Sequence, residues 1–599
     1  MMNEKNAAAR RAADWLLPLL CALSAAWAVQ FSYGAAAADR GQGVTDVLLT
    51  VALYLLFLYR RRACVSRVAA RRARILSAVF VLLTAVGGDW LTHMRYDAFT
   101  DVPLYVAYYL NAFVGTWLLF TCGLSLAFSL AEGAPAVGSA PRDGRRARRT
   151  FLVSFAVCAA VYFIFLLNQY PGAMESDHMR QLSALLNGVY ENRNPLVNSL
   201  IVYGCVSLVT ALGGSMNAGV FLYSVVQLLF LAAVFGYAVS LLYRVGCRRW
   251  AVIAALVFYA AVPYNIFYSY GMWKDSFFTG WLLLTVLKAW SFSVREKEGA
   301  RVRPLDYALL FFAALMASLS RNSGWSALLA FAPCLLLIKR PFAGKAALVT
   351  GGAVAAALVL MGPVYRALGV VPTADSITAA CVPLQQIGRV IVEDKPLTDE
   401  EAALIDAVAD RDAIRDTFDP MVADPMKDAV YPHIETLDAH MSDYVRLWLR
   451  LGAKYPLTYF RAYKDLLRMY YDPNVSSEVA YKWVYQNDFG VYRDPKLLPG
   501  LDFGYYESWL ELPALNLLKR PGAILWCLLA LWQVCALRGC RRMRVWYVPF
   551  LAVYAGLFFT APVALFRYVY SAAAALPLYF VFPFCGDRPP ADGALPPLP

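Results

Sequence analysis

The stretch NQYPGAMESDHMRQLSALLNGVYENRNPL (residues 168–196) lies between long apolar segments and is the first place where polar and charged residues crowd together. It opens with a turn signal, Tyr170-Pro171-Gly172. From Ser176 to Tyr190 the pattern then predicts a short amphipathic helix, with Asp177 and Gln181 on one face and methionine and leucine side chains on another. Because apolar segments flank the stretch on both sides, we expect this helix to lie at a membrane surface.

The composition predicts a polytopic membrane protein. Hydrophobic residues make up 60% of the chain and charged residues 16%, and the mean hydropathy is +0.49. The formal charge of +13 would suit nucleic acid or anionic lipid. The basic residues, however, cluster in short loops between apolar segments, which is the positive-inside signal of a membrane protein. The charge therefore indicates topology, and we expect no nucleic-acid partner.

The twelve cysteines indicate neither disulfides nor a cysteine-based metal site, because almost all lie in or beside apolar segments and none forms a CxxC pair. We expect the amino terminus in the cytoplasm, followed by about fourteen spans that each approach the roughly 20 residues needed to cross a bilayer. The expected spans are 15–33, 44–59, 75–91, 102–130, 151–167, 217–243, 250–266, 276–294, 305–320, 325–338, 346–361, 521–537, 545–562 and 568–584.

The apolar run 196–212 is the one segment for which hydropathy and charge disagree. If it spans the membrane, Arg244, Arg248 and Arg249 fall outside, against the positive-inside rule. If it lies along the outer interface, as amphipathic helices do, these arginines and all later basic loops fall inside. We therefore expect an interfacial helix at 196–212 and both termini in the cytoplasm.

The predicted fold class is an all-α polytopic membrane protein with an α-rich extracytoplasmic domain at 362–519. Within that domain, residues 391–445 are acidic and helix-like, and residues 455–510 are rich in tyrosine. Aromatic faces suit carbohydrate stacking, but they suit a small domain core or an interfacial belt equally well. The expected domains are a four-span module at 1–149, a transmembrane core at 150–361 with its first outer loop at 168–195, the domain at 362–519, and the last spans with a cytoplasmic tail at 520–599.

With this topology, polar residues gather at the outer ends of the helices. They are Glu175 and Asp177 in the first outer loop, Lys274 and Asp275 in GMWKDSF, Arg321 and Asn322 in SLSRNSGW, and Arg567 and Tyr568 in ALFRYVY. Cations are uncommon in short outer turns, and a phosphate held at the membrane surface would explain them, since lysine and arginine neutralise a departing phosphate. A nearby carboxylate would accept a proton from an attacking hydroxyl.

Each of these residues also has a purely structural explanation. Lys274 would reach the lipid headgroups, Arg321 would pair with backbone or with Asp275, Arg567 would anchor a helix end, and Asp177 would be an ordinary surface charge. The joint pattern is more specific than its parts. The expected spans carry almost no ionisable group, which disfavours an ion-coupled transporter.

The arrangement resembles the GT-C superfamily of membrane glycosyltransferases, and more closely an uncharacterised bacterial membrane family within or near that group. The resemblance covers about residues 150–584. It is carried by Tyr170-Pro171-Gly172, Asp177, Gln181, Asn194-Pro195-Leu196, Lys274-Asp275, Arg321-Asn322-Ser323-Gly324 and Arg567-Tyr568. The chain departs from the family pattern in two places. Ser176 separates Glu175 from Asp177, and Asn194 stands where the family has histidine, so which carboxylate acts and whether a divalent metal binds stay open.

The resemblance implies a GT-C-like core that transfers a sugar from a polyprenyl-phosphate donor to an envelope glycan, lipid or protein, with inversion, on the outer face of a bacterial plasma membrane. It implies that Asp177 is the base and that Glu175 is a second carboxylate or a metal ligand. Lys274, Arg321 and Arg567 would hold the lipid phosphate, while Gln181, Asp275, Asn322 and Tyr568 would help to bind the substrates. The alternatives are a lipid-linked glycan flippase or exporter, and a non-catalytic envelope-assembly protein with the same fold.

Overall fold

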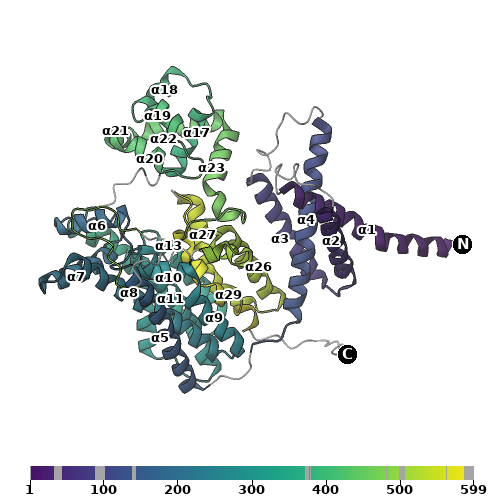
Figure 1. Cartoon of the computed structure of the whole chain (residues 1–599), viewed down its shortest axis with the longest axis horizontal. Helices are drawn as coiled ribbons and strands as arrows, with labels where there is room; N and C mark the ends of the chain where they lie inside the picture. The colour runs from purple at the N-terminus through teal and green to yellow at the C-terminus, as the bar shows by residue number, and fades with distance from the viewer. Residues whose placement is uncertain are drawn as a thin grey trace. The chain divides into compact units, whose positions relative to one another are not determined.

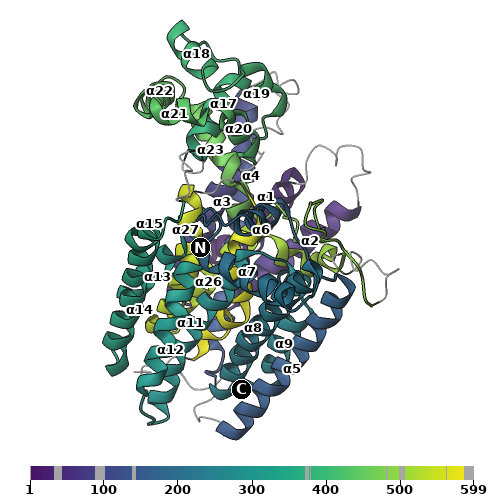
Figure 2. The ribbon, with the colours of Figure 1, turned by 90° about the vertical axis from the view of Figure 1, so that its left-hand side faces the viewer.

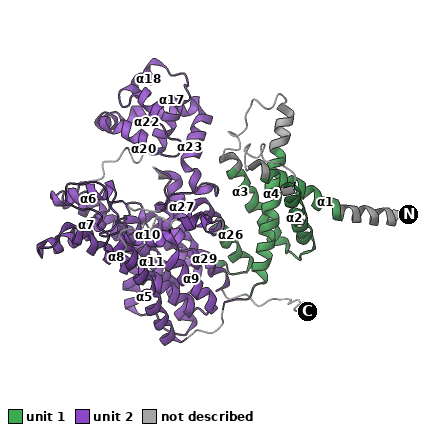
Figure 3. Ribbon diagram, in the orientation of Figure 1, with its two compact units in different colours: residues 1–135, 529–541, 588–599 green, residues 136–528, 542–587 purple. Residues whose placement is uncertain are grey.

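The computed structural model of the chain describes residues 2–32, 44–87, 102–137, 143–371, 377, 380–479, 483–497, 506, 508–560 and 563–585. Figure 1 shows the chain, and Figure 2 shows it turned by 90°. Within these ranges the fold is all-helical, and extended backbone pairs only in isolated bridges. The predicted all-α class is therefore confirmed. The chain forms two compact units (Figure 3): residues 1–135, 529–541 and 588–599, and residues 136–528 and 542–587.

The first unit contains α1 (Met2–Ser32), α2 (Val44–Arg62), α3 (Arg67–Gly87), α4 (Val102–Gly133) and the second half of α26 (Pro521–Leu537). Small residues let α1 and α4 approach closely, because a Cβ at Gly115 would collide with the Ser24 carbonyl. The Ser24 hydroxyl donates to Asn111 Oδ1 at 2.7 Å across the same contact. The Arg538 guanidinium donates to the carbonyls of Ala131 and Ala134 and so satisfies the carboxyl end of α4.

The second unit is built on a helix bundle. Its main helices are α5 (Gly144–Asn168), α8 (Met216–Arg244), α9 (Arg249–Ala261), α10 (Pro263–Tyr270), α11 (Lys274–Lys297), α12 (Pro304–Leu319), α13 (Gly324–Leu335), α14 (Pro341–Val359) and α27 (Val548–Thr560). Gly236 of α8 lets α5 pack closely, because a Cβ there would lie 3.0 Å from the Phe155 amide nitrogen. In Figure 2, α5, α8 and α9 run side by side.

Five described helices are long and apolar enough to cross a membrane, and the bent pair α9–α10 would make a sixth. The five are Leu110–Gly133, Gly144–Asn168, Met216–Arg244, Lys274–Lys297 and Pro341–Ala367. They indicate a membrane protein. Several other segments for which we expected spans form shorter apolar helices, including Pro304–Leu319, Gly324–Ile338 and Pro521–Leu537.

Two of the expected spans are broken at proline. The segment 250–266 bends by 48° between α9 and α10, where Pro263 begins the second helix. The segment 568–584 is divided into α28 (Tyr570–Ala574), α29 (Leu576–Tyr579) and the 3₁₀ turn η11 (Phe582–Phe584). Proline lies in the first turn of α29 and of η11. Its missing N–H and fixed ring prevent one continuous helix.

A helical subdomain within the second unit has its own apolar core. Its helices are α17 (Cys381–Val392), α18 (Asp399–Asp406), α19 (Arg411–Thr417), α20 (Asp424–Val430), α21 (Ile434–Ala439), α22 (Met441–Lys454) and α23 (Pro456–Tyr471). Two tyrosines from the aromatic tract have structural roles here. Tyr459 packs in the core, and the buried Tyr470 hydroxyl donates to the Val563 carbonyl at 3.0 Å. For Tyr459 the domain-core explanation holds, and Tyr470 makes a buried structural contact with the segment that precedes the last helices.

Candidate functional site

The first loop after α5 pairs with two segments that are distant in sequence. The Ala173 amide donates to the Tyr270 carbonyl at 3.3 Å, and the Met272 amide donates to the Ala173 carbonyl at 3.0 Å. The neighbouring Met174 exchanges hydrogen bonds of 2.9 Å with Trp483 and Tyr485. The loop is therefore held between the α10–α11 junction and a segment that follows the helical subdomain.

Gly172 makes this close approach possible. Its φ of +134° lies in the region that side chains disfavour. A Cβ at this position would also collide with Ser224 Oγ and would lie 2.8 Å from the Tyr270 carbonyl oxygen. The turn signal at Tyr170-Pro171-Gly172 thus marks the point where the loop packs tightly on α8.

The helix α6 (Ser176–Leu186) begins directly after this pairing and carries a buried neutral histidine. The Glu175 amide donates to His178 Nδ1 at 2.8 Å, which leaves the ring proton on Nε2. The ring contacts Trp273 edge-on, with centroids 4.4 Å apart. Burial lowers the pKa of His178 to about 3. The nearby Asp177 acts to raise this pKa, whereas Arg567 and Lys274 lower it further.

The pKa values of the two acidic residues beside this histidine are shifted in opposite directions. Burial acts to raise the pKa of Asp177, but Lys274 and Arg567 oppose it, and the pKa lies below its ordinary value. Burial raises the pKa of Glu175 above its ordinary value; Arg567 opposes this rise and Asp177 adds to it. Among the described residues, none donates a hydrogen bond to the Asp177 carboxylate or forms an ion pair with it. The lowered pKa favours the ionised form of Asp177, and its carboxylate oxygens are not hydrogen-bonded by the described residues.

Lys274 is joined to α6 through Asn194. Its ammonium group donates to Asn194 Oδ1 at 3.0 Å. The amide group of Asn194 donates in turn to the main-chain carbonyl of Asp177 at 3.4 Å. Asn194 thus keeps the cation of α11 beside the first turn of α6.

Arg321 and Asp275 form a buried ion pair at 3.4 Å. Asp275 is only 1% exposed, and its oxygens accept no hydrogen bond in the described part of the chain. The Arg321 guanidinium donates to the Tyr568 carbonyl at 3.2 Å and lies 4.9 Å from the centre of the Tyr568 ring and 5.6 Å from that of Phe278. These contacts join α11 and the α12–α13 turn to the 3₁₀ turn η10 (Phe566–Val569).

Arg567 lies over aromatic faces. Its guanidinium carbon is 4.0 Å from the centre of the Trp273 ring and 5.1 Å from that of Tyr568. A guanidinium N–H of Arg567 donates to the Tyr568 hydroxyl at 3.4 Å. Such stacking attracts the cation to the ring face and fixes its plane. Trp273 therefore touches both Arg567 and His178.

Two predicted site residues make contacts elsewhere. Gln181 is buried, and its amide donates to Ser199 Oγ at 2.6 Å, which packs α6 on α7 (Leu196–Ala211). Asn322 is exposed and donates to the Asn192 carbonyl at 2.9 Å. The structure thus brings together Glu175, Asp177, Lys274, Asp275, Arg321, Arg567 and Tyr568, while Gln181 and Asn322 support neighbouring loops.

The helix α7 begins and ends at the end of the bundle that carries this cluster. At its start, the Asn198 amide donates to the Ser320 carbonyl at 3.0 Å, next to Arg321. After its end, Ser224 in the early part of α8 donates to the Pro171 carbonyl at 3.0 Å. The opposite end carries the α8–α9 and α11–α12 loops, which are joined by a hydrogen-bonded ion pair between Arg244 and Glu298. The chain therefore reaches α8 without first crossing the bundle along α7.

The pattern of a family of unknown function, DUF6020, matches residues 182–588. The chain belongs to DUF6020. Neither the curated proteins nor the solved structures gave a match. The region matched to DUF6020 contains Lys274, Arg321 and Arg567, whereas Asp177 lies just before it.

Three residues of the cluster were not predicted to act in it, namely His178, Asn194 and Trp273. Signals for them exist in the sequence, since His178 directly follows Asp177 and Trp273 directly precedes Lys274. For Asn194 the sequence offers only its place where the family has histidine, yet it bridges Lys274 and α6. Within the described ranges, no group of three or more His, Cys, Asp or Glu side chains is placed to hold a metal ion.

Proposed function

We propose that this DUF6020 protein is a GT-C-like glycosyltransferase that moves a sugar from a polyprenyl-phosphate donor to an acceptor at the outer face of a bacterial plasma membrane. The observation that carries the proposal is the ionised Asp177 carboxylate beside Lys274 and Arg567. A base and phosphate-binding cations within one small cluster are the groups that such a transfer requires.

In the proposed reaction, Asp177 accepts the proton of the acceptor hydroxyl as its oxygen attacks the anomeric carbon. The bond between that carbon and the phosphate oxygen breaks, and the electron pair leaves with the polyprenyl phosphate. Lys274 and Arg567 balance the charge that develops on this phosphate. One in-line displacement inverts the sugar carbon and needs no covalent enzyme intermediate.

The remaining residues of the cluster hold these groups in place. Asp275 offsets much of the charge of Arg321, so Arg321 acts chiefly by fixing the position of Tyr568. Trp273 sets the plane of the Arg567 guanidinium. Glu175, whose pKa is raised, is a weaker candidate for the base at low pH because more of it is protonated there.

The proposed topology places the cluster outside, together with residues 362–519, and places both termini and the basic loops inside. Its support is that Asp177 and the Arg244–Glu298 pair lie at opposite ends of one bundle. A cysteine introduced at the exposed Arg180 should react with a membrane-impermeant reagent from outside, in a background without the native cysteines. A cysteine at the exposed Arg248 should react only after the membrane is opened. The reverse pattern would contradict the outer-face proposal.

The decisive experiment compares wild type with Asp177→Asn in purified, reconstituted protein. The substitution keeps the size of the side chain but cannot take a proton, so transfer should fall by about 10²–10⁴-fold. Binding of the polyprenyl-phosphate sugar should persist, because the phosphate contacts are made by Lys274 and Arg567. Asp416→Asn, at an exposed acid of the helical subdomain, is the matched control and should transfer normally.

Product analysis separates the proposal from the flippase alternative. Near-normal sugar transfer by Asp177→Asn would refute the base. Lipid-linked sugar that crosses vesicles unchanged, with no new glycosidic bond made by wild type, would identify a flippase instead.

A further inference from the structure

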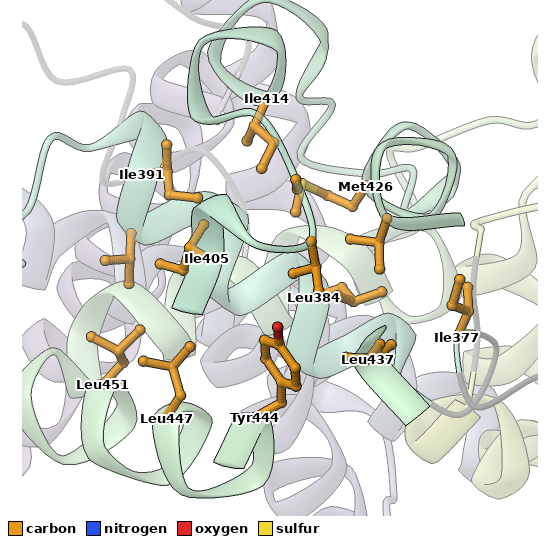
Figure 4. Packing of buried hydrophobic residues seen from close by; sticks show 14 of the residues in the cluster. Ile377, Leu384, Ile391, Ile405, Ile414, Met426, Leu437, Tyr444, Leu447 and Leu451 are labelled. Carbon is orange, nitrogen blue, oxygen red and sulfur yellow. The ribbon is translucent and has the colours of Figure 1, made fainter. Parts of the chain in front are cut away.

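The helical subdomain contains an apolar cavity of about 100 Å³. Its walls include Leu384 of α17, Ile405, Met426, Leu437 and Leu447, all of which are labelled in Figure 4. These side chains belong to five different helices, so the cavity is formed only when the subdomain is folded.

The polar groups of the cavity wall are already satisfied. The Tyr444 hydroxyl donates to the Leu404 carbonyl at 3.2 Å, and the Trp448 indole N–H donates to Gln386 Oε1 at 2.7 Å. A buried water needs two to four polar partners, and this wall offers none of that kind. The cavity therefore suits an apolar group and does not suit a sugar, a phosphate or a water.

The cavity is larger than the voids that close packing usually leaves in a folded interior. Folded interiors are close-packed, with few voids larger than a water molecule. An apolar cavity of about 150 Å³ in another protein takes up benzene. A volume of about 100 Å³ accommodates the end of one hydrocarbon chain but not a sterol-sized body.

The cavity opens to the surface between α17 and α22. Val445 lines the cavity and is nevertheless 45% exposed. Met441 and Trp448, one turn to either side on α22, also line it, as does Ile387 of α17. Leu449, one turn beyond Val445, is 58% exposed, so apolar surface continues outward from the opening. A chain longer than the cavity would follow this surface.

We propose that the subdomain binds the end of a lipid hydrocarbon chain in this cavity, with the chain entering past Val445. Hydrocarbon chains are the apolar molecules at highest concentration around a membrane protein, and the wall selects for nothing but apolar character. Both an isoprenoid chain and a fatty acyl chain have the required chemistry. The inference does not depend on the proposed sugar transfer, because it concerns a separate set of residues.

The test uses the full chain in nanodiscs and two probes that carry a diazirine at the end of the hydrocarbon chain. One probe is an acyl phospholipid and the other is a polyisoprenyl phosphate. After irradiation, mass spectrometry should find label on the peptides that contain Ile387 and Trp448, in addition to the label on the spans. Label from the isoprenoid alone, from the acyl lipid alone or from both identifies the source of the chain, and each result supports the site.

Two half-exposed valines of the subdomain provide a matched pair of variants. Val445→Asp puts a charge in the opening and should reduce subdomain labelling by about tenfold, the effect of leaving about two methylene groups unburied. Val392→Asp, at the end of α17 and outside the cavity wall, should leave the labelling unchanged. Labelling of the spans is the internal reference for both.

Filling the cavity gives an independent check. Ala409 lines the cavity and is buried, so Ala409→Leu should occupy the space, remove the subdomain label and preserve or raise the melting temperature. Absence of subdomain label in wild type would overturn the proposal. Equal labelling of wild type, Val445→Asp and Ala409→Leu would overturn it as well.

Discussion

The two ends of the bundle in the second unit use the same types of charged residue in different ways. At the end away from the cluster, Asp306 accepts hydrogen bonds from Lys288 at 3.1 Å, from Arg295, and from the Arg303 amide at 3.1 Å. At the other end, Asp177 accepts no hydrogen bond from the described residues, and Arg567 lies over the ring of Trp273.

This difference distinguishes a carboxylate that holds helices together from a carboxylate that is available to bind a ligand. We call the two ends of the bundle the fastened end and the open end. A carboxylate that is surrounded by its own donors holds helices together, but it has little capacity left for a ligand. A carboxylate that interacts with nearby cations electrostatically, without hydrogen bonds to them, keeps both its charge and its lone pairs available. The expected spans carry almost no ionisable group, and Lys288 in the expected span 276–294 is an exception. It pairs with Asp306 and so belongs to the fastened end.

The largest effect on stability is expected at the fastened end. Asp306→Ala should lower the free energy of unfolding by about 3–5 kcal/mol, because it leaves Lys288 and Arg295 without their buried partner. Asp177→Asn, which breaks no bond of this kind, should change it by less than about 1 kcal/mol. Thermal unfolding of both variants in detergent measures the difference. A loss at Asp177 as large as that at Asp306 would remove the distinction between the two ends.

The pH dependence of stability should come from the open end. Folded His178 stays neutral down to a pKa of about 3, whereas in the unfolded chain it takes a proton near pH 6.5. Below pH 6.5 the unfolded state therefore gains a proton that the folded state does not. The contribution of His178 to the free energy of unfolding is fully present above pH 6.5 and falls by about 1.4 kcal/mol per pH unit below it. Unfolding between pH 6.5 and 4.5 measures this slope before most carboxylates titrate.

The control for this slope is His178→Asn, which has no titratable group. It should flatten the pH dependence over the same interval, whatever its effect on stability at pH 7. An unchanged slope would show that another group is responsible.

The two arginines of the cluster should respond differently to removal. Arg567→Ala should reduce transfer by roughly tenfold or more, the usual effect of losing one charge-assisted bond of about 1.5–3 kcal/mol. Its folded yield should stay near that of wild type. Arg321→Ala should instead lower the yield, because it leaves Asp275 buried without its partner. Size-exclusion profiles and transfer rates of both variants, measured in parallel, test this contrast.

The smallest effect is expected at Asn322, a residue that the sequence predicts to bind substrate. It is exposed and donates one hydrogen bond to the Asn192 carbonyl. Asn322→Ala should change stability by no more than about 0.5 kcal/mol and leave the transfer rate unaltered. A large loss of transfer would show that Asn322 touches a substrate and would extend the open end as far as the α12–α13 turn.

The features that the sequence predicts best are those that depend on the pattern of neighbouring residues. The amphipathic helix expected from Ser176 to Tyr190 forms from Ser176 to Leu186. The pairing of Arg321 with Asp275, considered as a structural alternative, is present. The bend at Val262-Pro263 also had a local signal, because proline disfavours a continuous helix, although we expected one straight span there.

The sequence could not predict contacts that depend on the packing of distant loops. The bonds between Met174 and residues 483–485 involve short extended segments without periodicity, so nothing in either segment identifies the other. The stacking of Arg567 on Trp273 likewise requires η10 to lie beside the start of α11. The helical face that Gln181 shares with Asp177 predicts a place in the site, and only the packing of α6 on α7 shows that Gln181 donates to Ser199.

The wide spacing of the cluster along the chain has a consequence for biosynthesis. His178 contacts Trp273, and Trp273 contacts Arg567, so the last member is synthesised long after the first. At about 5–20 residues per second, ribosomes need roughly 20 to 80 s to make the intervening chain. During this interval α6 has left the ribosome while its final neighbour does not yet exist. The cluster is therefore completed only near the end of translation, and any product that stops before Arg567 would carry Asp177 without its full set of neighbours.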